Sequence, residues 1–199
     1  MISNVCKIEK GTRDLDAILK ESQKVAEYNE LTHKQALQLR LLCEEIDGML
    51  PKIIDDFDGD FWIEFTDGVC KVNASVVFEA FTAEKKEALV SVAKNKKNAA
   101  ATGIVGKIRS ELENIFLDED ALKLCAMSSG SFRVSGGYGE DAEYAYLWSL
   151  EQYKDAVKKE EKTEDWDELE KSVIASVADD IIVGVKGKKA DITIVKKFA

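Results

Sequence analysis

Two groups of carboxylate side chains are the first candidates for catalysis or metal binding. Grouped acids transfer protons in enzymes or hold metal ions. The first group lies within one helical pattern, at Glu44, Glu45 and Asp47. The second, in the sequence DDFDGDF, contains Asp55, Asp56, Asp58 and Asp60. It resembles part of a calcium loop, but no glutamate stands at the offset of that loop's last ligand. We therefore interpret the second group as a polar turn between a helix and a strand.

A basic cluster in the middle of the chain is the other candidate. It surrounds a connector of small residues, KNKKNAAATG, and includes Lys94, Lys96, Lys97, Lys107 and Arg109. The residues leave two interpretations open, a solvated connector or a surface that docks an anion or an acidic partner. The candidate anion-binding residues are Lys94, Lys96, Lys97, Asn98, Gly103, Gly106 and Lys107. A P-loop has four residues between its two glycines and a Ser or Thr after its lysine. The sequence GIVGKI at 103–108 has neither feature, so we do not assign a P-loop.

Metal and nucleophile chemistry lack the residues they need. The four cysteines, Cys6, Cys43, Cys70 and Cys125, form no C-x-x-C pair, and His33 is the only histidine. A zinc cluster is therefore not expected, and we assign no metal site. Cys43 and Cys70 fall in apolar patterns, which predicts buried, reduced thiols.

Composition limits the class of protein. The chain has 199 residues, 45% of them hydrophobic, which suits one domain with a real core. Its formal charge is −10, whereas nucleic-acid binding needs an excess of Lys and Arg, so we expect no nucleic-acid partner. No run approaches the roughly 20 apolar residues of a spanning helix, and the first ten residues do not resemble a signal peptide. We expect a cytoplasmic protein that does not enter a membrane.

Helices must position the first candidate group. Apolar periodicity predicts a helix over Leu15 to Tyr28 and a second one that starts at Thr32. Thr32 followed by Gln35 has the form of a capping box. Pro51 should end or kink the second helix near Leu50. The core stripe of this helix is predicted to be Leu37, Leu41, Leu42, Ile46, Met49, Leu50 and Ile53.

Two hairpins follow in the pattern. The first pairs 60–66 with 69–77 through Asp67-Gly68, a dipeptide typical of a type I′ turn. The second pairs 181–186 with 190–198 through Gly187-Lys188. Between the hairpins we expect helices at 82–92, 104–116, 144–158 and 166–178, and loop or short strand at 128–139. The order predicts an α+β, two-layer sandwich with an antiparallel or mixed sheet and helices on one face. Residues 80–165 are expected to be a lid or insertion within one domain, 1–199, with no strand of the sheet.

Two segments resemble the GHKL (histidine-kinase-like) ATPases, and within them the anti-sigma-factor serine kinases. The first is LTHKQALQLRLLCEEIDGMLPKII with the hairpin FWIEFTDGVCKVNASVVF. In that family a helix with a glutamate-containing N box precedes such a hairpin. The second is DELEKSVIASVADDIIVGVKGKKADITIVKKF. Family members similarly end with a helix, an acidic pair and a hairpin that finishes in Lys and an aromatic residue.

The family's nucleotide-binding residues do not carry over. The N box is Glu-x-x-x-Asn; Glu44 or Glu45 matches its glutamate, the candidate base, but Gly48 and Met49 stand in place of the asparagine. The Asp-x-Gly-x-Gly motif expected after the second strand is replaced by 73–80, NASVVFEA. The Gly-x-Gly that opens the last helix is replaced by Asp165-Trp166-Asp167.

The resemblance therefore implies a bacterial regulatory domain without catalysis. We expect it to act by contact with a protein partner or by self-association, with the acidic, aromatic stretch 140–166 as the contact surface and no cofactor. The alternative is an ATP-binding kinase-like enzyme with a rearranged site. In that case Glu44 or Glu45 is the base and the basic cluster holds the phosphates of Mg-ATP.

Overall fold

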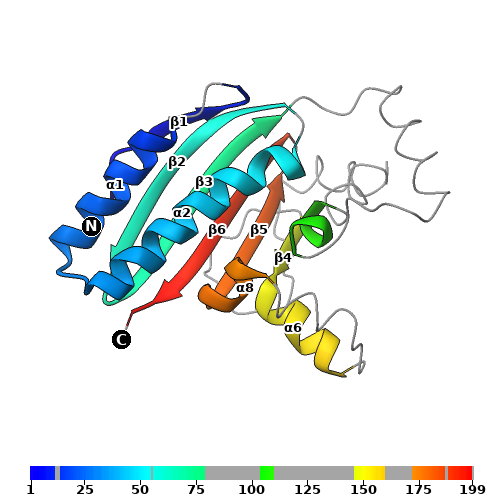
Figure 1. The fold of residues 1–199 in the computed structure, drawn as a ribbon. Helices are drawn as coiled ribbons and strands as arrows, with labels where there is room; N and C mark the ends of the chain where they lie inside the picture. Colours follow the sequence, from blue (N-terminus) through cyan, green and yellow to red (C-terminus); the bar gives the residue numbers. More distant parts are fainter. Residues whose placement is uncertain are drawn as a thin grey trace.

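The fold is a six-stranded antiparallel sheet covered by helices, seen in a computed structural model (Figure 1). The structure describes residues 1–11, 14–54, 56–78, 104–109, 146–159, 172–186 and 188–198. The strand order is β1-β2-β3-β6-β5-β4, and every neighbouring pair is antiparallel. The predicted α+β class and antiparallel sheet are confirmed.

Both predicted hairpins are present at the centre of the sheet. Strands β2 (Phe57–Thr66) and β3 (Val69–Phe78) pair from end to end, and Asp67 and Gly68 both have positive φ, as a type I′ turn requires. Strands β5 (Asp180–Lys186) and β6 (Lys189–Lys197) form the second hairpin. The two hairpins join through β3 and β6, so that Asn73 lies opposite Thr193.

The two edge strands are short and were not predicted. Strand β1 (Cys6–Glu9) pairs with β2, and β4 (Tyr146–Ser149) pairs with β5. The expected helix over 144–158 is therefore wrong at its start, because 146–149 are extended and helix α6 begins only at Leu150 (Leu150–Lys159). The expectation that 80–165 adds no strand is wrong for the same four residues.

The helices α1 and α2 lie side by side on one face of the sheet (Figure 1). Helix α1 (Leu15–Tyr28) has the predicted bounds, and Asp14 caps it by accepting from the Ala17 amide at 3.0 Å. Helix α2 (His33–Ile53) begins with the predicted capping box. The Thr32 amide donates to the Gln35 side chain at 2.9 Å, and the Gln35 amide donates to Thr32 Oγ1.

Pro51 predicted that helix α2 ends or kinks near Leu50, but the helix does not end there. It continues through Pro51 to Ile53, and the Ile54 amide still donates to the Leu50 carbonyl at 2.9 Å. Pro51 lacks the N–H of one helical hydrogen bond, but the bond from Ile54 still closes the last turn. Most of the α2 residues predicted to face the core are buried. Leu37, which is 53% exposed, is an exception, and Leu39 is buried.

Short helical segments complete the helical layer. Residues 104–109 are helical, as expected for the start of 104–116. Helix α8 (Val173–Val177) lies within the helix expected over 166–178, but that helix is wrong at Ser172, which is extended and caps α8, and at Ala178, which is also extended. The expected helix at 82–92, the loop or short strand at 128–139, and residues 110–116 and 166–171 lie outside the described residues. Ile104, Ile108 and Ile174 are buried in the same core as α2 and the sheet, which makes a two-layer sandwich.

Within the described ranges, no helix is both long and apolar enough to cross a membrane.

Candidate functional site

The α2 carboxylates point to different surroundings. Glu44 Oε1 accepts from Arg40 Nε at 2.9 Å, one turn earlier on the exposed side of the helix. Asp47, three residues after Glu44, is buried. Glu45 is partly exposed. Residues three apart occupy neighbouring positions on a helix, so Glu44 and Asp47 differ in environment and not in position: Glu44 is paired with Arg40 at the surface, whereas Asp47 is buried.

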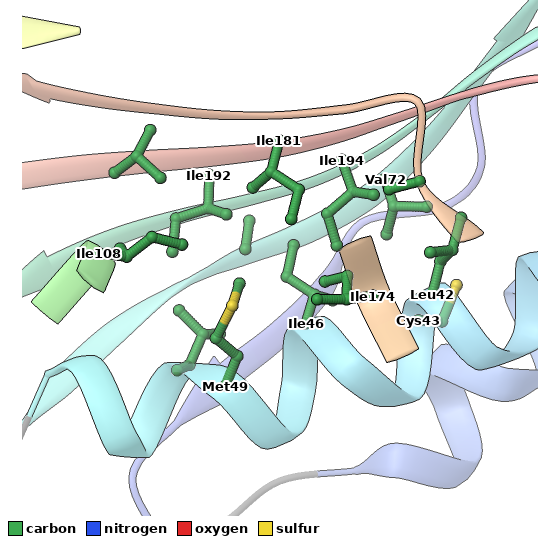
Figure 2. Close-up of a cluster of buried hydrophobic side chains, with 14 of the residues drawn as sticks. Leu42, Cys43, Ile46, Met49, Val72, Ile108, Ile174, Ile181, Ile192 and Ile194 are labelled. Carbon is green, nitrogen blue, oxygen red and sulfur yellow. The ribbon is translucent and has the colours of Figure 1, made fainter. Parts of the chain in front are cut away.

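Residues 104–109 close the space between the C-terminal half of α2 and the sheet. Ile104 and Ile108 are 3% and 1% exposed. Ile108 points into the apolar layer that also holds Met49 of α2 and Ile192 of β6 (Figure 2). Gly106, a candidate anion-binding residue, is buried. Apolar side chains therefore fill the layer beneath this half of α2.

The basic residues of this segment contact the protein itself. Lys107 Nζ lies 5.4 Å from the centre of the Tyr153 ring of α6, in cation–π geometry. Arg109 Nη1 donates to the Lys52 carbonyl at 3.0 Å, near the end of α2. These two contacts tie the segment to α6 and to α2. The other candidates, Lys94, Lys96, Lys97, Asn98 and Gly103, lie outside the described residues.

The segment expected to replace the Asp-x-Gly-x-Gly motif is largely strand. Strand β3 continues to Phe78, so Asn73 lies within it and not in a loop after it. Asn73 Oδ1 accepts from Thr193 Oγ1 at 2.9 Å across the β3–β6 pair. Asn73 thus stabilises the pairing of the two hairpins. Asp165, Trp166 and Asp167 lie outside the described residues.

The acidic pair before the last hairpin has a structural role. Asp180 Oδ1 accepts from the amides of Glu151, at the start of α6, and of Ile181, at 3.0 Å and 2.8 Å. A carboxylate is favourable at that position because the first N–H groups of a helix have no partner within it. Asp179 accepts from the Lys196 side chain and the Lys197 amide of β6. The pair thereby fixes α6 and β6 to the start of β5.

The sequence interpretation missed one buried carboxylate, Glu21 of α1. It accepts from the Asn4 amide at 3.0 Å, from Asn4 Nδ2 at 3.1 Å and from Lys24 Nζ at 2.6 Å. Burial alone raises the pKa of Glu21, but the hydrogen bonds from Lys24 and Asn4 outweigh it, and the pKa is lowered. The i, i+3 spacing of Glu21 and Lys24 could have indicated their ion pair from the sequence. The contact with Asn4, seventeen positions away, could not have been predicted in this way.

The cysteines agree with the expectation of buried thiols. Cys43 and Cys70 are buried and free, and Cys6 is partly buried. Burial raises the pKa of Cys70 to about 12 and also raises that of Cys43. Such thiols are protonated at neutral pH and are poor nucleophiles. Among the residues that the structure describes, no three His, Cys, Asp or Glu side chains are grouped to hold a metal.

The aromatic residues expected at a partner surface are used internally where they are described. Trp148 of β4 is 8% exposed and belongs to the core. Tyr153 packs beside it, with ring centroids 6.0 Å apart. The rest of the stretch 140–166, outside 146–159, is not among the described residues.

The chain was also compared with known proteins. No protein-family model, no curated protein and no solved structure matches it.

Proposed function

We propose that this chain is a GHKL-like regulatory domain of the cytoplasm that has lost nucleotide chemistry and acts by binding another protein. Support for the fold assignment comes from the order of the elements. A capped helix with Glu44 and Glu45 precedes the β2–β3 hairpin, and α8 and Asp179-Asp180 precede a hairpin that ends in Lys197-Phe198.

The loss of catalysis is supported by one observation above all. Residues 104–109 pack against the C-terminal half of α2, and their Ile104 and Ile108 are buried in the core with Met49, so apolar side chains fill the layer between this half of α2 and the sheet (Figure 2). A triphosphate with its magnesium ion needs polar donors and open space. The described part of the basic cluster offers instead a buried Gly106 and a Lys107 placed over Tyr153.

A binding role then follows from what the domain retains. Its two hairpins and helix pair form one packed body, and the whole chain has a net charge of −10. A rigid acidic surface of this kind discriminates partners through electrostatic complementarity. Binding therefore needs no nucleotide and no cofactor.

Thermal unfolding with millimolar Mg-ATP and Mg-ADP tests the loss of nucleotide binding. A ligand at a hundredfold its dissociation constant stabilises a protein by about 2.7 kcal/mol, which raises Tm by several degrees at this chain length. We expect no change in Tm with either nucleotide. ATP with EDTA is the matched control, since it separates magnesium-dependent binding from general anion effects.

A magnesium-dependent rise of several degrees contradicts the proposal. The variants Glu44→Gln and Glu45→Gln then show whether either carboxylate is required for turnover. Release of phosphate that depends on one of them establishes the enzyme instead.

A further inference from the structure

Leu37 is a large apolar side chain on the surface, although the sequence pattern predicts that it faces the core. Leu37 of α2 is 53% exposed, although Leu41 and Leu42 follow it at helical spacing. The neighbouring Leu39 is fully buried and takes the core position. Leu37 is therefore displaced from the core stripe and points to the outer side of the helix pair.

Leu37 borders a groove between the two helices, which we call the α1–α2 groove. It has a volume of about 850 Å³ and is lined on its apolar side by Leu19, Ala26, Leu31, Ala36 and Leu37. Small side chains at Ala26 and Ala36 leave room between larger ones at Leu19 and Leu31. An apolar side chain inserted there would contact leucines on both sides.

The groove carries an excess of negative charge. Asp16, Glu27 and Glu30 line it, against Lys20 and Arg40. Arg40 is already paired with Glu44 at 2.9 Å, which reduces what it offers a ligand. Glu27 and Glu30 stand at the same end of the groove, near the turn between the helices. The charges therefore complement a partner with basic side chains beside its apolar ones.

The groove follows most of α1. Its lining residues on that helix run from Asp16 to Glu27, about 16 Å at 1.5 Å per residue, which corresponds to about three helical turns. A helix laid in a groove between two helices presents apolar residues at i, i+3, i+4 and i+7. Apolar floor, acidic rim and length together describe one kind of occupant.

We propose that the α1–α2 groove binds a basic amphipathic helix of a partner protein, with apolar residues against Leu19 and Leu37 and Lys or Arg side chains against Glu27 and Glu30. This inference rests on the proposed binding function and names its surface and the class of its partner. The net charge of −10 favours the approach of such a helix from solution.

A labelled synthetic peptide is a direct probe of the groove. The peptide has about 14 residues, with Leu at the helical i, i+3, i+4 and i+7 positions and Lys elsewhere. Binding is measured by fluorescence anisotropy on the full chain. We expect Leu37→Gln to weaken binding about tenfold, because a leucine contact is lost. We expect Glu27→Gln with Glu30→Gln to weaken it about threefold and to make it less sensitive to salt.

Matched controls separate the groove from other surfaces. Val173→Gln removes an exposed apolar side chain from another helix, α8, where Val173 is 49% exposed. It should bind the peptide like the unaltered chain. A peptide of the same composition in scrambled order should bind at least about tenfold more weakly, because it has no apolar face. Thermal unfolding of each variant confirms that the fold is retained.

Several results overturn the inference. Absence of peptide binding does so, as does equal binding by Leu37→Gln and Val173→Gln, or by a Leu/Glu peptide of the same pattern. If sedimentation shows a dimer that Leu37→Gln converts to a monomer, the occupant is a second copy of this chain. Nucleotide binding would contradict only the proposed loss of catalysis, so the two failures are distinguishable.

Discussion

The two halves of helix α2 differ in what covers them. Its C-terminal half packs on Ile108 and the sheet, and Arg109 donates to the Lys52 carbonyl, while Glu44 of this half stays on the exposed side of the helix. Its N-terminal half, with Leu37, borders the α1–α2 groove. One helix thus has one end whose inner side is filled by apolar side chains and another end that borders an open groove. The half in which the sequence suggested chemistry is the filled one, and we infer binding at the other.

The largest expected effect comes from truncating Ile108, the side chain that packs under the C-terminal half of α2. Ile108→Ala deletes buried carbons from a packed site, and we expect a loss of about 3 kcal/mol in the free energy of unfolding, measured in urea. Val105→Ala, which alters a partly buried neighbour on the same segment, should cost less than about 1 kcal/mol. Equal effects of the two changes would mean that Ile108 does not pack under α2.

The helix pair that frames the open half depends on a buried carboxylate. Glu21→Gln weakens the contacts with Asn4 and Lys24, and we expect a loss of about 2 kcal/mol at pH 7. Because the folded state lowers the pKa of Glu21, its ionised form stabilises the fold. That contribution is complete above the pKa of an unfolded glutamate, about 4.3, and is lost as pH falls through the lower, folded value.

Urea unfolding of both proteins between pH 7 and pH 3 measures this contribution. The difference in the free energy of unfolding between the unaltered chain and Glu21→Gln should shrink as the pH falls. Glu27→Gln, on the same helix, should change stability by less than about 0.5 kcal/mol at pH 7. A difference for Glu21→Gln that stays constant with pH would show that its charge is not what stabilises α1.

The smallest expected effect is a gain, within the C-terminal half of α2. Gly48 is within the helix, and a Cβ built on it meets no atom within 4 Å. Gly48→Ala should therefore stabilise the protein by about 1 kcal/mol, since alanine has the higher helix propensity. Thermal unfolding measures the gain. Destabilisation would place an unseen neighbour at this position and would weaken the description of the C-terminal half.

Local signals predicted the central part of the fold. The Asp67-Gly68 turn, the Thr32–Gln35 capping box and the apolar periodicity of α1 each involve residues within a few positions of one another. The edge strands could not be predicted in this way. Four residues carry too little periodicity, and Tyr146–Ser149 is extended because it pairs with Ile182–Val185, more than thirty positions away.

The candidate site was less predictable because side-chain environments depend on distant contacts. Leucines stand at 37, 39, 41 and 42, and periodicity alone did not distinguish the exposed Leu37 from the buried Leu39. The buried state of Glu21 depends on Asn4, and that of Asp180 on the start of α6. Packing against other elements decided each of these outcomes.

The β3–β6 pair has a consequence for how the chain folds. Asn73 and Thr193, which are hydrogen-bonded across it, are 120 positions apart, whereas each hairpin closes over two residues. Folding rates fall as contacts become more distant in sequence, so we infer that the hairpins form early and that their joining limits the rate. The entropy of closing a long loop grows only by about 0.6 kcal/mol per doubling of its length. The stability of the joined sheet therefore depends little on the entropy of closing this long connection, whereas the joining of β3 to β6 sets the time that the chain spends incompletely folded.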